Sequence, residues 1–214
     1  MRRSLHFVPG GNDRMFEKAL KLPADSLILD LEDSVTPSNK KAARDEVCNW
    51  INEIDFENQE CLVRINPLDT SWGLDDLQAV VEVLPDGIVL PKVAKKKDVT
   101  KIDSIVGDVE RQKQIEEGSI SFVLIGTEVP EAVFNLYKMA KIPRVDAITW
   151  GAEDLSGALG AKAKRDSEGN YLEVFSYVRS ACLLAAVAGA ANPIDAVYVA
   201  VSYTHLTLPT ICSV

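Results

Sequence analysis

Several features that would narrow the class of function are missing from this sequence of 214 residues. No apolar run approaches the ~20 residues that a membrane-spanning helix needs, and the apolar stretch near the N-terminus is too short for a signal peptide. Basic residues are few, with 23 Lys and Arg against 32 Asp and Glu, and the net charge of −9 argues against a nucleic-acid-binding protein. An anionic substrate remains compatible with this charge, because a local Arg or Lys can dominate a pocket.

Cysteine motifs and flexible linkers are lacking as well. Cys48, Cys61, Cys182 and Cys212 show neither a CxxC pair nor the spacing of metal ligands. Scattered cysteines without a secretion signal indicate reduced thiols in a cytoplasmic protein. No segment rich in Pro, Gly or Ser divides the chain, so we expect a single domain.

Short apolar runs rich in Val, Ile and Leu recur along the chain, and most precede a stretch with helical periodicity. The runs are continuous rather than alternating, which is typical of strands that are buried on both faces of a parallel sheet. Seven strands are predicted in this way, at residues 4–8, 26–31, 61–65, 87–91, 121–126, 146–150 and 195–199. Ser38 is a predicted N-cap, and Pro130 is expected in the first turn of a helix.

Seven βα steps fit either of two α/β folds. One is a doubly wound sheet, and the other is a TIM (β/α)₈ barrel that lacks its last βα unit. In the barrel, functional residues gather at the carboxyl ends of the strands. The polar residues at those ends are Gly10, Gly11, Asp30, Glu32, Asp33, Arg64, Lys92, Glu128, Glu153 and Asp154. Carboxylates suit Mg²⁺, and an Arg can hold a substrate carboxylate through two hydrogen bonds.

Each candidate also has a structural interpretation. Glu128 could simply cap the helix that begins at Pro130, and Asp154 could be the N-cap of the segment LSGALG. Arg64 could form a buried ion pair with Asp30 or Glu32. Arg14 could lie on a plain helix surface, and the two glycines could mark only a turn. A structural network is the alternative for three more side chains: Lys92, Glu32 and Asp33.

Eight segments together carry a family resemblance, and they occur in the family's order. They are RSLHFVPGGNDRM, LILDLEDSV, VRINPLDT, GIVLPKV, TEVPEAVFNL, WGAEDLSGALGA, RDSEGNYLEVFSYVRS and PIDAVYV. The sequence thereby resembles the HpcH/HpaI aldolase and citrate lyase beta-subunit family over nearly all of residues 1–199. The resemblance implies a TIM barrel of the phosphoenolpyruvate/pyruvate type, assembled as a homotrimer or homohexamer.

The same resemblance implies roles for individual residues. Glu128 and Asp154 match the ligands of Mg²⁺, for which Mn²⁺ is the alternative metal. Arg64 matches the residue that binds the 2-oxo acid carboxylate and helps to stabilise an enolate. Gly151 and Ala152 match backbone amides that face this carboxylate.

Further positions match less specific parts of the family pattern. Pro9, Gly10 and Arg14 lie where the family receives coenzyme A, with Arg14 near its phosphates. Lys92, Glu32 and Asp33 line the mouth of the site as further catalytic candidates.

The resemblance implies a carbon–carbon lyase, which cleaves or forms a 3-hydroxy-acyl-CoA such as malyl-, citramalyl- or citryl-CoA. The partners are then an acyl-CoA and a 2-oxo acid, with no nucleic acid and no membrane. Two other functions remain open: a Mg²⁺-dependent aldolase acting on free 2-keto-3-hydroxy acids, and a truncated or non-catalytic subunit. The segments GGNDR and RDSEGNY favour the thioester reaction.

The end of the sequence departs from the family pattern. Ala200 stands where the family has an acid, and SYTHLTLPTICSV resembles translated adapter sequence. We therefore expect an incomplete barrel domain over residues 1–199 and a tail at 200–214 that is not native, in which His205 and Cys212 have no chemical role. A barrel without its last strand would expose sheet edges.

Overall fold

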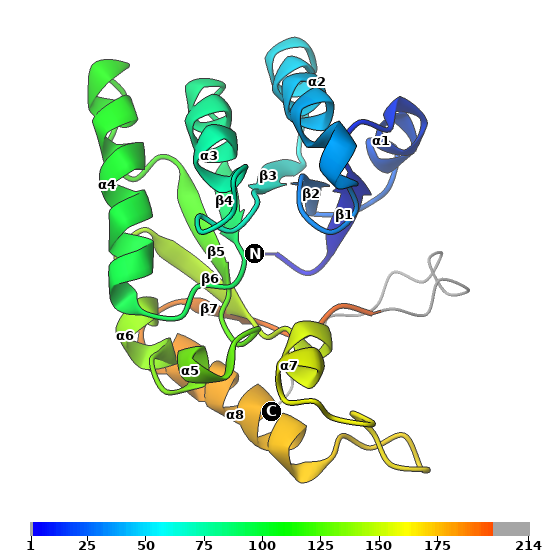
Figure 1. The fold of residues 1–214 in the computed structure, drawn as a ribbon. Coiled ribbons are helices and arrows are strands. Elements are labelled where there is room, and N and C mark those ends of the chain that lie inside the picture. The colour runs from blue at the N-terminus through cyan, green and yellow to red at the C-terminus, as the bar shows by residue number, and fades with distance from the viewer. Residues whose placement is uncertain (1, 199–214) are drawn as a thin grey trace. The chain divides into compact units, whose positions relative to one another are not determined.

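The computed structural model of the chain describes residues 2–198 (Figure 1). These residues divide into two compact units, 2–88 with Tyr198, and Val89–Val197. Seven strands alternate with helices in the described residues, which confirms the α/β class. Among these residues, no helix is both long enough and apolar enough to cross a bilayer.

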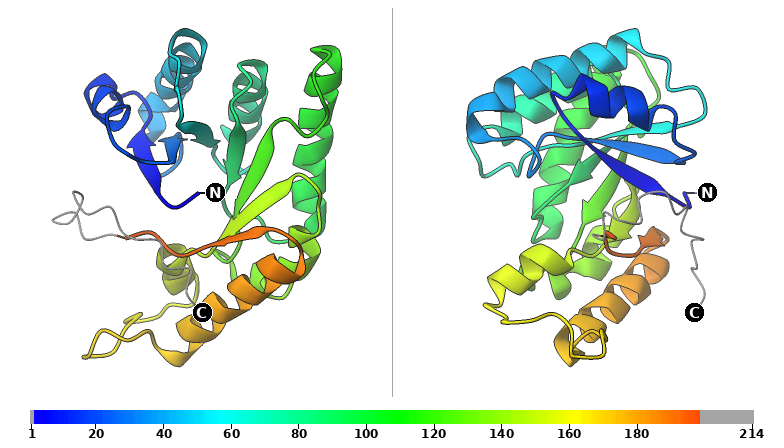
Figure 2. Two further views of the ribbon diagram at one scale, coloured as in Figure 1. Left: turned by 180° about the vertical axis from the view of Figure 1, so that it is seen from behind. Right: turned by 90° about the vertical axis from the view of Figure 1, so that its right-hand side faces the viewer.

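The first unit is built on three parallel strands, β1 (Leu5–Pro9), β2 (Ser26–Asp30) and β3 (Glu60–Arg64). Every residue of β2 is buried, as its continuous apolar sequence predicts. The helices of this unit are α1 (Asp13–Ala19), η1 (Pro37–Asn39), α2 (Lys40–Glu53) and α3 (Gly73–Glu82). Both views of Figure 2 show α1 and α2 along one face of β1 and β2. Phe16 and Trp50 stack between these two helices, with ring centroids 4.2 Å apart.

The second unit repeats this pattern. Its parallel strands are β5 (Ser121–Ile125), β6 (Val145–Thr149) and β7 (Asn192–Ile194). Its helices are α4 (Lys96–Gln112), α5 (Pro130–Val133), α6 (Leu136–Ala140), α7 (Ala152–Ala158) and α8 (Glu173–Ala188). Strand β4 (Gly87–Leu90) runs across the boundary between the two units. Phe122 and Phe175 are fully buried in the second unit's core.

The seventh strand was predicted at the wrong place. Strand β7 covers Asn192–Ile194 rather than 195–199, of which residue 199 lies outside the described part of the chain. The carboxylate of Asp195 accepts hydrogen bonds from Trp150 Nε1 at 2.8 Å and from the Ala196 N–H at 2.9 Å. These bonds hold the chain in a loop immediately after Ile194, although DAVYV has the composition of a strand.

The predicted N-cap at Ser38 is wrong as well. Ser38 lies inside the short helix η1, and α2 begins after Asn39. Pro37 occupies the first position of η1, where its fixed φ and missing N–H are tolerated. The expected position of Pro130 is confirmed, because α5 begins there.

The strand order within each unit bears on the choice between the two α/β folds. Strands that are neighbours in the chain pair in both units, β2 with β1 and β3, and β6 with β5 and β7. Such an order is that of a (β/α)₈ barrel, whereas a doubly wound sheet reverses its order at one point. The closed barrel and the domain limit at residue 199 stay predictions. The predicted tail at 200–214, with Ala200, His205 and Cys212, lies outside the described residues.

Candidate active site

The predicted site residues form two groups, one in each unit. In the first unit, Arg64 at the end of β3 pairs in the ladder with Asp30 at the end of β2. The guanidinium donates from Nε to Asp30 Oδ1 and from NH2 to Asp30 Oδ2, both at 2.7 Å. The central guanidinium carbon, Cζ, also lies 4.9 Å from the centre of the Phe7 ring in β1. The Arg64–Asp30 ion pair that the sequence left open is thus present.

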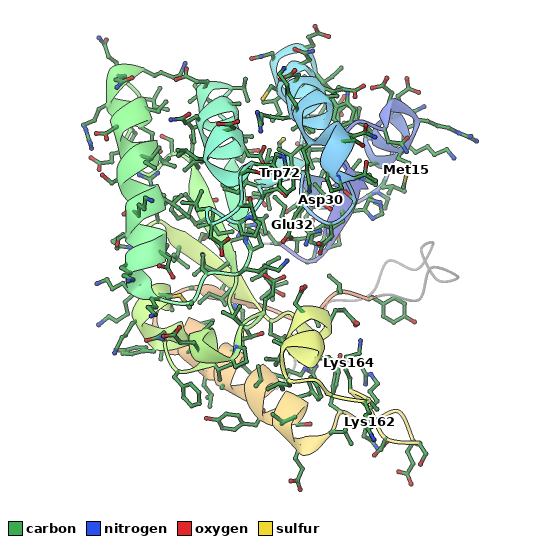
Figure 3. All side chains as sticks on the ribbon, viewed as in Figure 1. Met15, Asp30, Glu32, Trp72, Lys162 and Lys164 are labelled. Carbon is green, nitrogen blue, oxygen red and sulfur yellow. The ribbon has the colours of Figure 1, made fainter. Side chains whose placement is uncertain are left out.

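The remaining terminal nitrogen of Arg64 faces two further acids. Its NH1 lies 2.9 Å from Glu32 Oε2 and 3.6 Å from Asp33 Oδ2. The Glu32 side chain is only 4% exposed, whereas that of Asp33 is 59% exposed. The structure therefore brings together Arg64, Glu32 and Asp33, and Figure 3 marks Asp30 and Glu32 at this end of the strands.

Charge pairing controls the ionisation of this cluster. Burial pushes the pKa of Asp30 upward, but the hydrogen bonds and charge of Arg64 outweigh it and lower the pKa overall. Burial also disfavours the charged form of Arg64, yet hydrogen bonds to Asp30 and the charges of Glu32 and Asp33 raise its pKa. Both partners therefore stay ionised, and removing either would leave a buried charge at a cost of about 3–5 kcal/mol.

The loop that carries Glu32 is held by residues that the sequence reading missed. Lys40 Nζ donates to the carbonyls of Leu31 at 2.8 Å and Glu32 at 2.6 Å. Asn66 Nδ2 donates to the Leu31 carbonyl at 2.8 Å and to Asp76 Oδ2 at 2.6 Å. Burial lowers the pKa of Lys40, although the surrounding acids oppose this. A Lys at the start of a helix is normally exposed to solvent. Only the burial of Lys40, which the sequence does not reveal, indicates that it holds this loop.

Asp76 connects this loop to α2. Its Oδ1 accepts a hydrogen bond from Arg44 Nε at 2.7 Å, and its side chain is fully buried. Lys40 also lies 5.6 Å from the ring centre of Trp72, which Figure 3 marks beside Asp30 and Glu32. The acids facing Arg64 thus stand on a backbone that both α2 and the loop after β3 hold in place.

The predicted coenzyme A residues follow β1. The Gly10 N–H donates to the Asp30 carbonyl at 2.9 Å, and a Cβ on Gly10 would lie 2.9 Å from that oxygen. Gly10 is therefore required for the close approach of β1 to β2 and is more than a turn residue. Asn12 caps α1 by accepting from the Met15 N–H, and Arg14 is exposed on that helix.

In the second unit, Lys92 lies beside two of the predicted acids. The Lys92 N–H donates to Glu128 Oε2 at 2.6 Å, and Lys92 Nζ lies 3.6 Å from Asp154 Oδ1. Glu128 is 3% exposed, whereas the side chain of Asp154 is 34% exposed. Glu128 and Asp154 therefore each lie beside Lys92.

The helix-capping alternatives for both acids are wrong. The N-cap of α5 is Val129, and no side chain caps that helix. The N-cap of α7 is Gly151, so Asp154 lies inside the first turn. Neighbouring Glu153 forms an ion pair with Lys164 from the loop after α7, which separates its role from that of Asp154.

Gly151 is in close contact with Glu128. A Cβ at Gly151 would lie 2.6 Å from Glu128 Cγ, so only glycine leaves room for this carboxylate. The Gly151 N–H donates to the Thr127 hydroxyl at 3.0 Å, and Ala152 opens α7. The predicted amide of Gly151 thus has a partner within the protein.

The donors of the second group fit a magnesium ion. Glu128 and Asp154 are two carboxylates, and Mg²⁺ is typically bound by one or two carboxylates together with water and substrate oxygens. The ammonium of Lys92 beside Asp154 marks a place where a cation is stabilised, and the Lys92 N–H binds Glu128. No cluster of three or more His, Cys, Asp or Glu suited to a metal occurs in residues 2–198, so a site supplied by protein ligands alone is not found there.

Comparison with known proteins agrees with this chemistry. The sequence model of the HpcH/HpaI aldolase/citrate lyase family matches residues 3–208. The chain belongs to this family. Citrate lyase subunit beta of Escherichia coli (strain K12) is 35% identical over 198 residues, which cover 92% of this chain and 64% of the relative.

One further relative is named for a thioester, and one similar solved structure contains magnesium and coenzyme A. The (3S)-malyl-CoA thioesterase of Cereibacter sphaeroides (strain ATCC 17029) is 31% identical over 196 residues, which cover 92% of this chain and 63% of the relative. The chain therefore spans less than two thirds of these curated relatives. The structure of protein CitE from Mycobacterium tuberculosis in complex with magnesium, acetoacetate and coenzyme A matches with a TM-score of 0.75 at 28% identity. That match covers 94% of this chain and 68% of the CitE chain.

Proposed function

We propose that the whole protein is a magnesium-dependent carbon–carbon lyase of the TIM-barrel type. It cleaves a 3-hydroxy-acyl-CoA, such as malyl-, citramalyl- or citryl-CoA, into an acyl-CoA and a 2-oxo acid, or catalyses the reverse reaction. The observation that carries this proposal is the meeting of Glu128 and Asp154 at Lys92, in a chain of the citrate lyase family. A pair of carboxylates is suited to hold a divalent ion that keeps room for the oxygens of an anionic substrate.

Glu128 and Asp154 hold the metal in this proposal, with Mg²⁺ as the preferred ion and Mn²⁺ as the alternative. When bound, the ion supplies Lewis-acid stabilisation of negative charge on substrate oxygens. Gly151 leaves the space that Glu128 occupies. The Lys92 N–H fixes the orientation of one Glu128 oxygen, so that the carboxylate is preorganised.

Arg64 acts on the acid end of the substrate. Arg64 donates from Nε and NH2 to Asp30, and its NH1 faces Glu32 and Asp33. Asp33 is exposed and 3.6 Å away, so a substrate carboxylate can replace it at NH1. Planar guanidinium recognition of carboxylates is a general property of Arg. The amides of Gly151 and Ala152 are proposed as donors to a substrate carboxylate, which would compete with Thr127 for the Gly151 N–H.

The proposed cleavage moves one proton and one bonding electron pair. The substrate hydroxyl gives up its proton, for which Glu32 and Asp33 are the proposed acceptors. The adjacent C–C bond breaks, the former hydroxyl oxygen becomes the ketone of the 2-oxo acid, and the bonding pair forms a thioester enolate. The positive charge of Arg64 stabilises this enolate electrostatically, and protonation of its carbon yields the acyl-CoA.

The coenzyme A end is assigned to residues after β1. Pro9 ends β1 and Gly10 begins the turn after it, and the exposed Arg14 on α1 is the proposed contact of the phosphates. Magnesium and coenzyme A in the CitE complex support this assignment. A homotrimer or homohexamer and a cytoplasmic location are part of the same proposal.

A substrate panel distinguishes the proposed lyase from the aldolase. The whole protein is incubated with MgCl₂ and either 3-hydroxy-acyl-CoA thioesters or free 2-keto-3-hydroxy acids, and released 2-oxo acid is measured. We expect cleavage of at least one thioester and a kcat/KM for free acids at least about 100-fold lower, because remote binding energy lowers the barrier. Faster cleavage of the free acids would favour the aldolase, and cleavage of neither would favour a non-catalytic subunit.

A further inference from the structure

Lys92 has an unusual backbone conformation at the point where β4 ends. Its φ is 53°, in the left-handed region that residues with a Cβ seldom adopt. Such strain persists only where the surroundings stabilise it, and it is concentrated at functional positions. Here the strained residue uses its backbone N–H for Glu128, at 2.6 Å.

The side chain of the same residue reaches the second acid. Lys92 Nζ lies 3.6 Å from Asp154 Oδ1, and the two side chains are 33% and 34% exposed. One residue therefore contacts both acids, one through its backbone and the other through its ammonium. Glu128, which is 3% exposed, requires such compensation, because a buried carboxylate without donors or a nearby cation is costly.

A divalent cation on these carboxylates has the same electrostatic role as the ammonium. An ion held by Glu128 and Asp154 would place two positive charges beside Lys92, and like charges at such short range repel. The ammonium and the ion therefore compete for Asp154. The coupling free energy is the same in both directions. Bound ion therefore weakens the Lys92–Asp154 contact by the same factor by which that contact weakens binding of the ion.

We propose that Lys92 is an internal counter-ion of the magnesium site, which competes with the metal for Asp154 and sets the metal affinity. This role rests on the proposed function, because it takes Glu128 and Asp154 as the metal ligands. The backbone N–H keeps Glu128 in place throughout, while the ammonium leaves Asp154 when the ion binds. Lys92 thereby tunes the affinity without being a ligand.

Calorimetric titration of the whole protein with MgCl₂ tests the competition. In Lys92→Met the dissociation constant for Mg²⁺ should fall roughly tenfold, as expected for a lost coupling of ordinary size. Lys92→Arg keeps the charge and should stay within about twofold of the wild type. The matched control is Lys95→Met, because Lys95 pairs with Glu131 at 2.9 Å on the same segment. Its Mg²⁺ affinity should not change.

Chemical labelling gives a second readout that needs no variant. Reductive methylation followed by mass spectrometry measures how accessible each amine is. Saturating Mg²⁺ should speed the labelling of Lys92 by severalfold and leave Lys95 unchanged. This measurement holds even if a variant at position 92 fails to fold.

Three outcomes separate this inference from the proposed function. Unchanged or weaker Mg²⁺ binding in Lys92→Met, with labelling of Lys92 unaffected by the ion, overturns the counter-ion role. If Glu128→Gln and Asp154→Asn nevertheless lose affinity, the metal site itself stands. If those two variants bind Mg²⁺ like the wild type, the assignment of the ligands fails, and the counter-ion role fails with it.

Discussion

Arg64 forms a structural ion pair and is also the proposed residue for binding the substrate carboxylate. Its bidentate contact with Asp30 satisfies a charge that is 9% exposed, and its NH1 still faces Glu32 and Asp33. The two interpretations drawn from the sequence therefore do not exclude each other. The sequence alone indicated that Arg64 needs an acidic partner, because an unpaired charge in a buried strand is costly.

Replacing Arg64 by Lys separates these two contributions. Lys keeps the charge but cannot donate twice to Asp30 while also presenting a nitrogen to a substrate. We expect kcat/KM for thioester cleavage to fall at least about 100-fold, with a loss of about 1–3 kcal/mol in unfolding free energy. Steady-state kinetics and urea denaturation measure the two effects. A variant that unfolds readily, but whose folded fraction turns over normally, would show that Arg64 is structural only.

Lys40, Asn66 and Asp76 mark the limit of residue-level prediction. Each is an ordinary polar residue in the sequence, yet the fold buries all three and joins them to the loop that carries Glu32. Their partners are backbone carbonyls and residues distant in the chain. Such contacts depend on tertiary packing, which local composition does not encode.

At the scale of elements, continuous apolar runs predicted the strands well and the ends poorly. Strands β1 to β6 lie within about one residue of the predicted positions, whereas β7 lies three residues before its predicted start. The apolar pattern identifies which segments are buried, but a strand ends where its backbone stops forming hydrogen bonds with the neighbouring strand. For β7 that change is made by Asp195, whose carboxylate holds Trp150 and pairs with Arg179.

The start of β2 offers a pH-dependent test of element pairing. Asp25 accepts hydrogen bonds from the N–H groups of Arg3 at 2.8 Å and Ser4 at 2.9 Å, which ties the segment before β1 to β2. The side-chain hydrogen bond from Arg3, with smaller help from these N–H groups, lowers the pKa of Asp25 to about 2. A carboxyl whose pKa is lower in the folded state stabilises it above the unfolded pKa. That contribution disappears as the pH falls from about 4 to about 2.

Urea unfolding of wild type and Asp25→Asn across this pH range measures the contribution. We expect the variant to be less stable at neutral pH, and the difference should shrink steadily below about pH 4. Asp45→Asn serves as a control, because Asp45 is an exposed partner of Lys41. A stability difference that stays constant down to about pH 2 would contradict the linkage.

At the scale of the whole molecule, the order of the motifs carried more information than any single motif. Each polar group at a strand end has a plausible structural explanation, and the structure confirms one of them for Arg64 while excluding helix capping for Glu128 and Asp154. Family membership, matched over residues 3–208, then supports the proposed reaction class. The specific acyl group depends on pocket shape, which strand-end residues alone do not encode.

Glu128 and Asp154 are the proposed magnesium ligands of the lyase. Isothermal titration of the whole protein with Mg²⁺ in the presence of a 2-oxo acid tests this assignment most directly. We predict that Glu128→Gln and Asp154→Asn each weaken Mg²⁺ binding at least about tenfold, because each loses a charged oxygen ligand. Glu153→Gln is the matched control, since Glu153 pairs with Lys164 instead, and it should bind Mg²⁺ like the wild type. Unchanged affinity in both Glu128→Gln and Asp154→Asn would contradict the account.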